Sequence, residues 1–581
     1  MRHILILLTI LLPVYAQETM IREVFDVKTD THVEVLALFT QPPRGGFFPV
    51  RVKIANNLGT ERSVSLDFKS STRYDNRVQT QSSFYFTAPA GKTVTRDIMV
   101  PICVSTNISS GSFGGDQPSI TANLSGSLGN AENTIRNQTN ANMSAVLLSE
   151  ALFTANASKL DDEVKTRSGG SGYYGGTNFA GKFDPKQLPS DWLAFAGYDS
   201  VIMTDRDWSN VPASGRNAIL SWMNLGGQLV IFAQGGQSLS TLGIPEDSGY
   251  GSCRIHSIGS DLIVSPKATV DLVAGQNPVN QIAKSIDNDY NGSWPLQKLF
   301  GDKDFHYGLF IIVLVIFGVL VGPVNLFVLA KSGQRHKLFI TTPIISLGAS
   351  LLLIGLIIFQ DGFGGEGMRR VLMEVRPDGG QNAAFLHQEQ ISRTGILTSA
   401  NFKVDPACMM SPVPIAQSRW SRFTNRYDTK GSFNLVPSGG KMEGSGDWWQ
   451  SRSEHGHALS AVISTRGRIE ATSNPGEFVS TFDFPLETFY FLDANQQWHR
   501  ADSVTTGKPF KATPVDATMA EPALAKEAVA FTTRNRQMLE RAKSRKGHFV
   551  AITTHAPGID TLTGIRWKET RTVLTGPVLA R

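Results

Sequence analysis

The sequence has few cysteines and little net charge, and each shortage excludes a class of function. Only Cys103, Cys253 and Cys408 occur among 581 residues, and they form neither a CxxC pair nor a metal-ligand spacing. A disulfide scaffold is therefore excluded, since one disulfide at most can form. The formal net charge of +5 is small for this length, so the composition gives no indication of nucleic-acid binding.

Charged side chains are absent from two long apolar runs, residues 310–329 and 338–359. Each run has about the 20 residues that an α-helix needs to cross a bilayer core of roughly 30 Å. The sequence therefore predicts transmembrane helices over residues 306–330 and 338–360. Because neither run contains an ionisable residue, we expect no proton or ion pathway.

The short segment between the runs, residues 331–337, is basic. It carries Lys331, Arg335 and Lys337, and short cationic loops stay on the cytoplasmic side of a membrane. We therefore expect a helical hairpin with a cytoplasmic loop and with all large regions on the opposite side.

The N-terminus fits this orientation. Arg2 and His3 precede an apolar run, and Val14-Tyr15-Ala16 provides suitable residues at a signal-peptidase site. The sequence predicts a signal peptide over residues 1–16, cleaved after Ala16. An uncleaved signal anchor is the alternative, and it leaves the same regions outside.

Two patterns precede the hairpin and a third follows it. Residues 17–142 alternate apolar and polar side chains, which predicts an immunoglobulin-like β-sandwich. Residues 143–300 alternate strands with a helix that begins at Pro212, which predicts a parallel sheet in an α/β domain. Residues 366–581 predict a β-rich extracytoplasmic domain with one helix, residues 522–546. The expected fold class is thus multidomain, α/β plus all-β.

Several segments of the α/β region and of the hairpin carry a family resemblance. They are Leu188-Pro189-Ser190-Asp191-Trp192, Tyr198-Asp199-Ser200-Val201-Ile202, Trp222-Met223-Asn224-Leu225-Gly226-Gly227-Gln228-Leu229-Val230, Gly322-Pro323-Val324-Asn325 and Thr341-Thr342-Pro343. Over residues 140–365 the chain resembles bacterial membrane proteins that combine a degenerate class I glutamine amidotransferase-like domain with a two-helix hairpin. The resemblance implies the bacterial plasma (inner) membrane as the location.

The resemblance does not extend to catalysis. Amidotransferases place a nucleophilic cysteine on a sharp turn after a strand like residues 228–232. Here Ala233-Gln234-Gly235-Gly236 follows that strand, without Cys, Ser or Thr. We therefore expect a binding or scaffold protein of the cell envelope with a protein partner and no cofactor. The alternatives are an envelope hydrolase with another site and a carbohydrate-binding protein.

Two histidines form the best candidate for a metal site. If Glu454-His455-Gly456-His457 is extended, both imidazoles lie on one face, as metal binding requires. Further ligands would have to come from elsewhere, such as His548 or His555. A polar loop is the alternative, and we assign no metal.

Three other segments have a structural and a functional interpretation. Cys253 and His256 point to opposite faces of a strand and cannot form a nucleophile–base pair. The Gly-rich residues 168–176 lack a phosphate-binding ending, but Tyr173 and Tyr174 offer contacts to a partner or glycan. A basic helix end is either solvated or docked on lipid headgroups. Its residues are Arg534, Arg536, Arg541, Lys543, Arg545 and Lys546.

Within the membrane helices we expect Pro323, Asn325 and Pro343 to have structural roles. Proline kinks a helix, and an asparagine amide in an apolar setting needs a partner. Thr341, Thr342 or Ser346 would lie at a compatible depth in a tight hairpin, so we predict that Asn325 holds the two helices together. The last of these candidate partners, Ser346, lies one turn further along the second run.

Overall fold

A computed structural model describes most of the chain, and its residues fall into two compact units. The described residues are 18–72, 78–102, 118–139, 144–167, 178–273, 294–303, 307–378, 381–413, 415 and 431–580. Unit 1 comprises Met1–Asn76 and Thr80–Ile282, and unit 2 comprises Arg77–Gln79 and Ala283–Arg581. The predicted signal peptide, the Gly-rich residues 168–176 and Cys103 lie outside the described residues.

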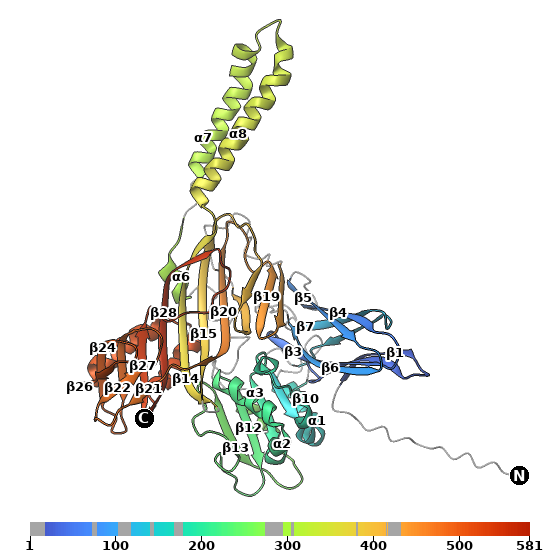
Figure 1. Cartoon of the computed structure of the whole chain (residues 1–581), viewed down its shortest axis with the longest axis vertical. Helices are drawn as coiled ribbons and strands as arrows, with labels where there is room; N and C mark the ends of the chain where they lie inside the picture. The colour runs from blue at the N-terminus through green and yellow to red at the C-terminus, as the bar shows by residue number, and fades with distance from the viewer. Residues whose placement is uncertain are drawn as a thin grey trace, which may run out of the picture. The chain divides into compact units, whose positions relative to one another are not determined.

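The first part of unit 1 contains two antiparallel sheets, drawn in blue in Figure 1. One has the order β1-β2-β3-β6, with bounds Glu18–Asp26, Thr31–Ala37, Phe47–Asn56 and Lys92–Pro101. The other has the order β5-β4-β7-β8, with bounds Val78–Ala88, Arg62–Thr72, Pro118–Gly126 and Ala131–Arg136. Val33 and Val35 of β2 are fully buried whereas Glu34 is not, because a pleated strand turns successive side chains to opposite faces. This region is β-rich, in agreement with the predicted β-sandwich.

The second part of unit 1 is a five-stranded parallel sheet, which confirms the predicted parallel pairing. Its order is β10-β9-β11-β12-β13, with bounds Gly181–Phe183, Val146–Ser149, Ser200–Thr204, Gln228–Ala233 and Ser252–Ser257. All residues of β9, β11 and β12 are buried, as in parallel strands covered on both faces. The helices are α1 (Glu150–Arg167), α2 (Asp205–Asn210), α3 (Ala213–Asn224) and α4 (Pro266–Val273).

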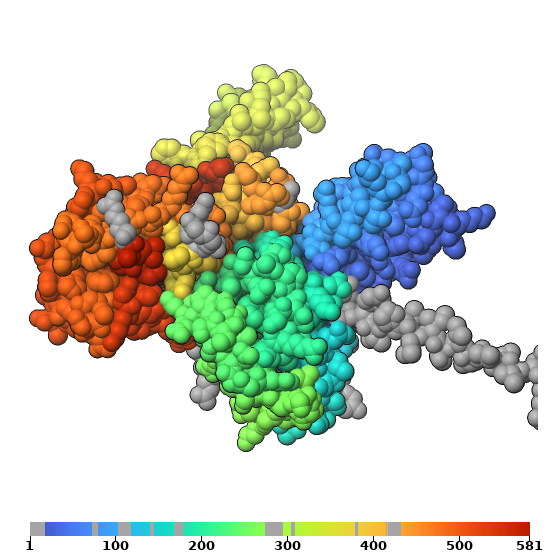
Figure 2. Space-filling view, turned by 60° about the horizontal axis from the view of Figure 1, so that its bottom comes forward, coloured from blue at the N-terminus to red at the C-terminus, as the bar shows by residue number. Residues whose placement is uncertain are grey.

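The two parts of unit 1 are joined by close packing, and their surfaces meet in the space-filling view (Figure 2). The hydroxyl of Tyr198 donates to the carbonyl oxygen of Gln41 at 2.6 Å, and the rings of Tyr198 and Phe39 meet edge to face at 5.5 Å. A Cβ added to Gly197 would lie 2.1 Å from the carbonyl oxygen of Gly45. The backbones therefore approach closely here, and the two predicted domains form one unit.

Unit 2 is organised around a twelve-stranded sheet whose main path is β17-β20-β15-β14-β28-β27-β23-β24-β26. These strands have the bounds Cys408–Val413, Glu454–Thr465, Gln381–Thr394, Gly365–Asp378, Ile565–Ala580, His548–Thr553, Leu486–Leu492, Trp498–Val504 and Thr513–Val515. β21 (Ile469–Ala471), β22 (Glu477–Ser480) and β25 (Pro509–Lys511) extend the sheet beside β28. A smaller antiparallel group has the order β16-β19-β18, with bounds Phe402–Val404, Lys441–Gly446 and Gly431–Ser438. Strands β14 and β28 pair in parallel.

The structure corrects two boundaries in this region. The single helix predicted over residues 522–546 is two helices, α9 (Ala517–Val529) and α10 (Thr533–Lys543). The chain breaks between them because the backbone N–H and hydroxyl of Thr532 donate to the buried carboxylate of Glu389 at 3.0 and 2.6 Å. The predicted α/β domain extends too far, since α6 (Pro295–Phe300) packs against β14 and β15 in unit 2.

Two helices of unit 2 are long and apolar enough to cross a membrane. They span Gly308–Leu329 and Arg335–Asp361, close to the predicted ranges 306–330 and 338–360. The first consists of α7 (Tyr307–Val319) and the π-helical η4 (Leu320–Leu329), and the second of η5 (Arg335–Lys337) and α8 (Leu338–Asp361). Most of their apolar side chains are exposed, which is unusual for a surface in contact with water.

Candidate functional site

Ligands of open α/β sheets bind at the carboxyl ends of the parallel strands, and unit 1 contains such a sheet. A cavity of about 280 Å³ lies at the ends of β12 and β13, beside α4. Its lining residues are Phe232, His256, Ser257, Ile258, Ile263, Val264, Ser265, Ala268, Thr269 and Leu272. Apolar side chains dominate this wall, and four residues, including His256, add polar groups.

His256 is the titratable side chain in this wall, and the described residues give it no catalytic partner. Its ring packs against Phe232 with centroids 5.8 Å apart, and its Nε2 is buried without a hydrogen-bond partner among the described residues. Ser257 follows it in β13, so the two side chains point to opposite faces of the sheet. The cavity can therefore enclose a small, mainly apolar group, and His256 is the imidazole in its wall.

Polar groups at the neighbouring strand ends have structural partners. The hydroxyl of Ser149, at the end of β9, donates to Asp207 Oδ2 at 2.6 Å. The same carboxylate accepts from the backbone N–H of Thr204 at 3.2 Å, and Thr204 Oγ1 accepts from the N–H of Asp207 at 3.0 Å. These bonds form a capping box that begins α2. Ser149 and Asp207 therefore stabilise a helix N-terminus.

The turn after β12 has the geometry of a sharp bend without a nucleophile. Gly235 and Gly236 adopt φ angles of +76° and +66°, a left-handed conformation that glycine accepts readily. Cys253 pairs with Leu229 near the opposite end of the sheet. Burial raises the pKa of its thiol to about 12, so the thiolate needed for attack is scarce. Cys253 is therefore a half-buried, unreactive residue of β13.

The second described cysteine lies in unit 2. Cys408 is fully buried in β17, and burial raises the pKa of its thiol to about 12. Cys253 and Cys408 are both free thiols. Neither has the environment of a reactive cysteine.

The two histidines of β20 do stack, as the extended segment predicts, but three of their four ring nitrogens already have hydrogen-bond partners. The rings of His455 and His457 are 6.4 Å apart and nearly parallel. His457 Nε2 donates to the carbonyl oxygen of Trp448 at 3.0 Å, which leaves Nδ1 to accept from the amide of Gln390 at 3.4 Å. The backbone N–H of Gln450 donates to His455 Nε2 at 2.9 Å. No cluster of three or more His, Cys, Asp or Glu able to hold a metal occurs in the described ranges.

Asn325 forms the contact between the two apolar helices that its position suggests. Its side chain is fully buried. Its Nδ2 donates to Thr342 Oγ1 at 2.8 Å, and the hydroxyl of Thr341 donates to its Oδ1 at 2.6 Å. Pro323 lies in the π-helical turn before it, and Pro343 lies near the start of α8. The amide therefore satisfies both of its polar ends across the helix pair.

The predicted loop and the predicted basic helix end have different surroundings. Lys331, Arg335 and Lys337 are all exposed at the tip of the hairpin. By contrast, Lys543 and Arg545 pair with Glu540 at 2.5 Å and Glu374 at 2.6 Å. Ion pairing within unit 2 therefore accounts for part of the basic end of α10.

Comparison with known proteins adds no assignment at this point. No family model and no curated protein matches the chain.

Proposed function

We propose that this chain is a binding or scaffold protein anchored in a bacterial plasma membrane, with both units on the extracytoplasmic side. One observation carries the proposal: two exposed apolar helices interrupt unit 2 as a hairpin. Apolar side chains at this density are stable in a hydrocarbon layer, because contact with lipid tails keeps them away from water.

Contacts at the base of the hairpin support an even number of spans. Arg393 of β15 donates from Nη2 to the carbonyl oxygen of Gly301 at 2.7 Å, and its guanidinium lies 4.5 Å from the ring centroid of Phe300. Gly301 precedes the first helix and Arg393 follows the second. The chain must therefore leave and return on one side, and the basic loop favours the cytoplasm for the opposite side.

The α/β part supports binding in preference to catalysis. In this proposal it is an amidotransferase-like domain that has lost its nucleophile, and its apolar cavity beside His256 contacts a ligand or an envelope protein. A hydrolase would need an activated nucleophile or a metal near that cavity. The described residues around it offer an imidazole and hydroxyl groups without such an arrangement.

Site-directed labelling tests the anchoring and the sidedness together. In a variant without native cysteines, Ala494→Cys on an exposed turn of unit 2 and Ser332→Cys in the hairpin loop are treated with an impermeant maleimide. We expect labelling of the first in intact spheroplasts and of the second only after lysis. The reverse pattern, or release of the chain by carbonate washing, contradicts the proposal. Turnover of an envelope polymer by the purified chain contradicts the binding role.

A further inference from the structure

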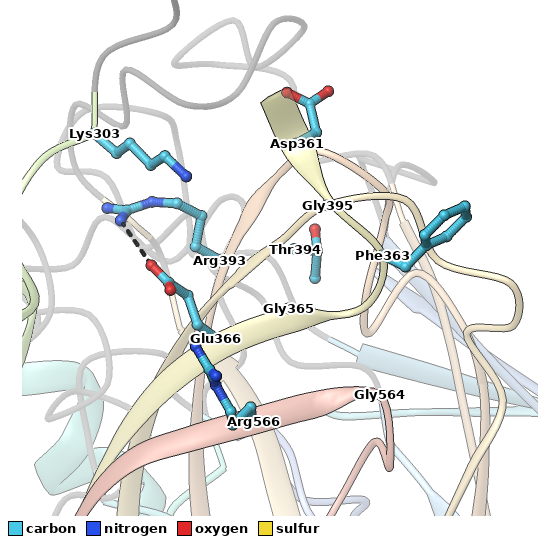
Figure 3. Close-up of a pocket in the computed structure, with 10 residues that line it drawn as sticks. All are labelled: Lys303, Asp361, Phe363, Gly365, Glu366, Arg393, Thr394, Gly395, Gly564 and Arg566. Atoms are coloured by element: carbon cyan, nitrogen blue, oxygen red, sulfur yellow. Dashed lines mark ion pairs between the residues drawn. The ribbon is translucent and has the colours of Figure 1, made fainter. Parts of the chain in front are cut away.

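A second cavity, of about 410 Å³, lies in unit 2 where the chain enters and leaves the hairpin. Its wall includes Lys303, which precedes α7, Asp361, which ends α8, and Phe363 just beyond (Figure 3). Phe359 and Phe363 are 91% and 66% exposed, so the exposed apolar surface of the hairpin continues to the rim of this cavity. If the helices cross a membrane as proposed above, this cavity opens at headgroup depth.

The side chains that line this cavity are charged. Lys303, Arg393 and Arg566 contribute cations, and Asp361 and Glu366 contribute carboxylates. Figure 3 shows the Arg393 and Glu366 side chains facing each other across the wall, with Arg393 Nη1 3.8 Å from Glu366 Oε1.

Neighbouring cations already compensate the acidic groups. Asp361 Oδ2 lies 2.5 Å from Arg452 Nε, and Glu366 Oε2 lies 2.7 Å from Lys568 Nζ. Arg393 is held by Glu454, which accepts from its Nε at 2.8 Å. Among the described residues, each of these three carboxylates therefore has a cation within ion-pair distance.

Arg566 is a cation of the cavity wall that these ion pairs leave unused. Its side chain is exposed, and it makes no ion pair within the part of the chain that the structure describes. A guanidinium presents several N–H donors in one plane and binds phosphate oxygens in pairs. A volume of about 410 Å³ lies within the usual range of ligand sites.

We infer that this cavity binds the phosphate of an anionic phospholipid headgroup from the adjoining leaflet. The inference rests on the proposed membrane anchoring and adds the ligand class. The basic lining attracts the phosphate, and the acyl chains of the lipid lie along the exposed apolar helices.

The test is a titration of the full chain in an uncharged detergent, with binding measured by isothermal titration calorimetry. The probes are short-chain phosphatidylglycerol, phosphatidylcholine with the same acyl chains, and inorganic phosphate. We expect the anionic lipid to bind at least about tenfold more tightly than the zwitterionic one, and its affinity to fall as salt rises. Arg566→Glu should lower the affinity for phosphatidylglycerol about tenfold or more, and Arg566→Gln should lower it by less.

Lys508→Glu is the matched control, since it reverses one exposed charge of unit 2 outside the cavity wall. It should bind phosphatidylglycerol as the unaltered chain does. Unchanged binding by both Arg566 variants, or equal affinity for the two lipids, overturns the inference. Displacement of the lipid by inorganic phosphate at equal concentration assigns a free-anion site and also overturns it. The short-chain lipids are soluble, so the calorimetry measures lipid binding without a membrane. The labelling experiment tests the anchoring, and its failure is therefore distinguished from a failure of lipid binding.

Discussion

We expect acid to destabilise unit 2 through one buried histidine, His457. Its side chain is 1% exposed, and its ring lies 4.4 Å from that of Trp449. Burial, with a smaller contribution from neighbouring His455, lowers the pKa of His457 from 6.5 to about 3. The hydrogen bonds to Trp448 and Gln390 hold the neutral ring in place.

The sign of the effect follows from proton uptake by the unfolded chain. Below pH 6.5 the unfolded histidine binds a proton that the folded one does not bind until about pH 3. The stability is therefore fully present above pH 6.5 and is lost as the pH falls toward the folded pKa. At pH 5, protonation of the unfolded histidine raises the ratio of unfolded to folded chain by a factor of about 30. This corresponds to a loss of about 2 kcal/mol in the free energy of unfolding.

Denaturant unfolding of the full chain in detergent at pH 7.5 and pH 5, followed by tryptophan fluorescence, measures this loss. The variant His457→Gln keeps an amide donor and acceptor but cannot titrate, so its loss between the two pH values should be smaller by about 2 kcal/mol. His555→Gln is the control, because the His555 side chain is 57% exposed. If His457→Gln keeps the full pH dependence, the reasoning is wrong.

Three further substitutions test other contacts. Asn325→Leu should weaken the helix pair by about 1 kcal/mol, and resistance of the hairpin to SDS measures it; an unchanged midpoint contradicts the role of the amide. Gly197→Ala should lower the melting temperature of unit 1, because its Cβ would meet a backbone oxygen at 2.1 Å, whereas Gly59→Ala meets nothing within 4 Å. Equal melting of the two variants contradicts the close approach. Glu389→Gln should cost about 2 kcal/mol in denaturant, since the carboxylate accepts four hydrogen bonds in the core, whereas exposed Glu443→Gln should cost little.

The elements that could be predicted are those whose local signals agree with their final environment. Helix α3 begins after Pro212 and ends before Gly226-Gly227, so residues next to the helix in the sequence indicate both its start and its end. The apolar helices are equally clear, because no charge interrupts them. Helix α1 is different: its buried positions Leu152, Asn156, Leu160 and Val164 include a polar residue. The amide of Asn156 donates to the carbonyl oxygen of Leu262 at 2.8 Å. A contact 106 positions away therefore accounts for the burial of this polar side chain, and the local sequence pattern does not show it.

The same distinction separates the two cavities. The turn without a nucleophile is visible in the sequence because the strand and its turn are contiguous. The charged cavity was not predicted, since Lys303, Arg393 and Arg566 come from three distant segments that only the long sheet of unit 2 brings together. The break between α9 and α10 was missed for a similar reason, because Glu389 lies 143 residues from Thr532.

Strand β14 is synthesised long before β28, the strand with which it pairs. The two strands touch through residues such as Arg369 and Thr570, which are 201 positions apart. At a synthesis rate of about 5–20 residues per second, β14 remains without this partner for roughly 10–40 seconds. An unpaired strand edge is a template for aggregation during that wait. Expression conditions that slow elongation beyond β15 should therefore lower the yield of folded protein.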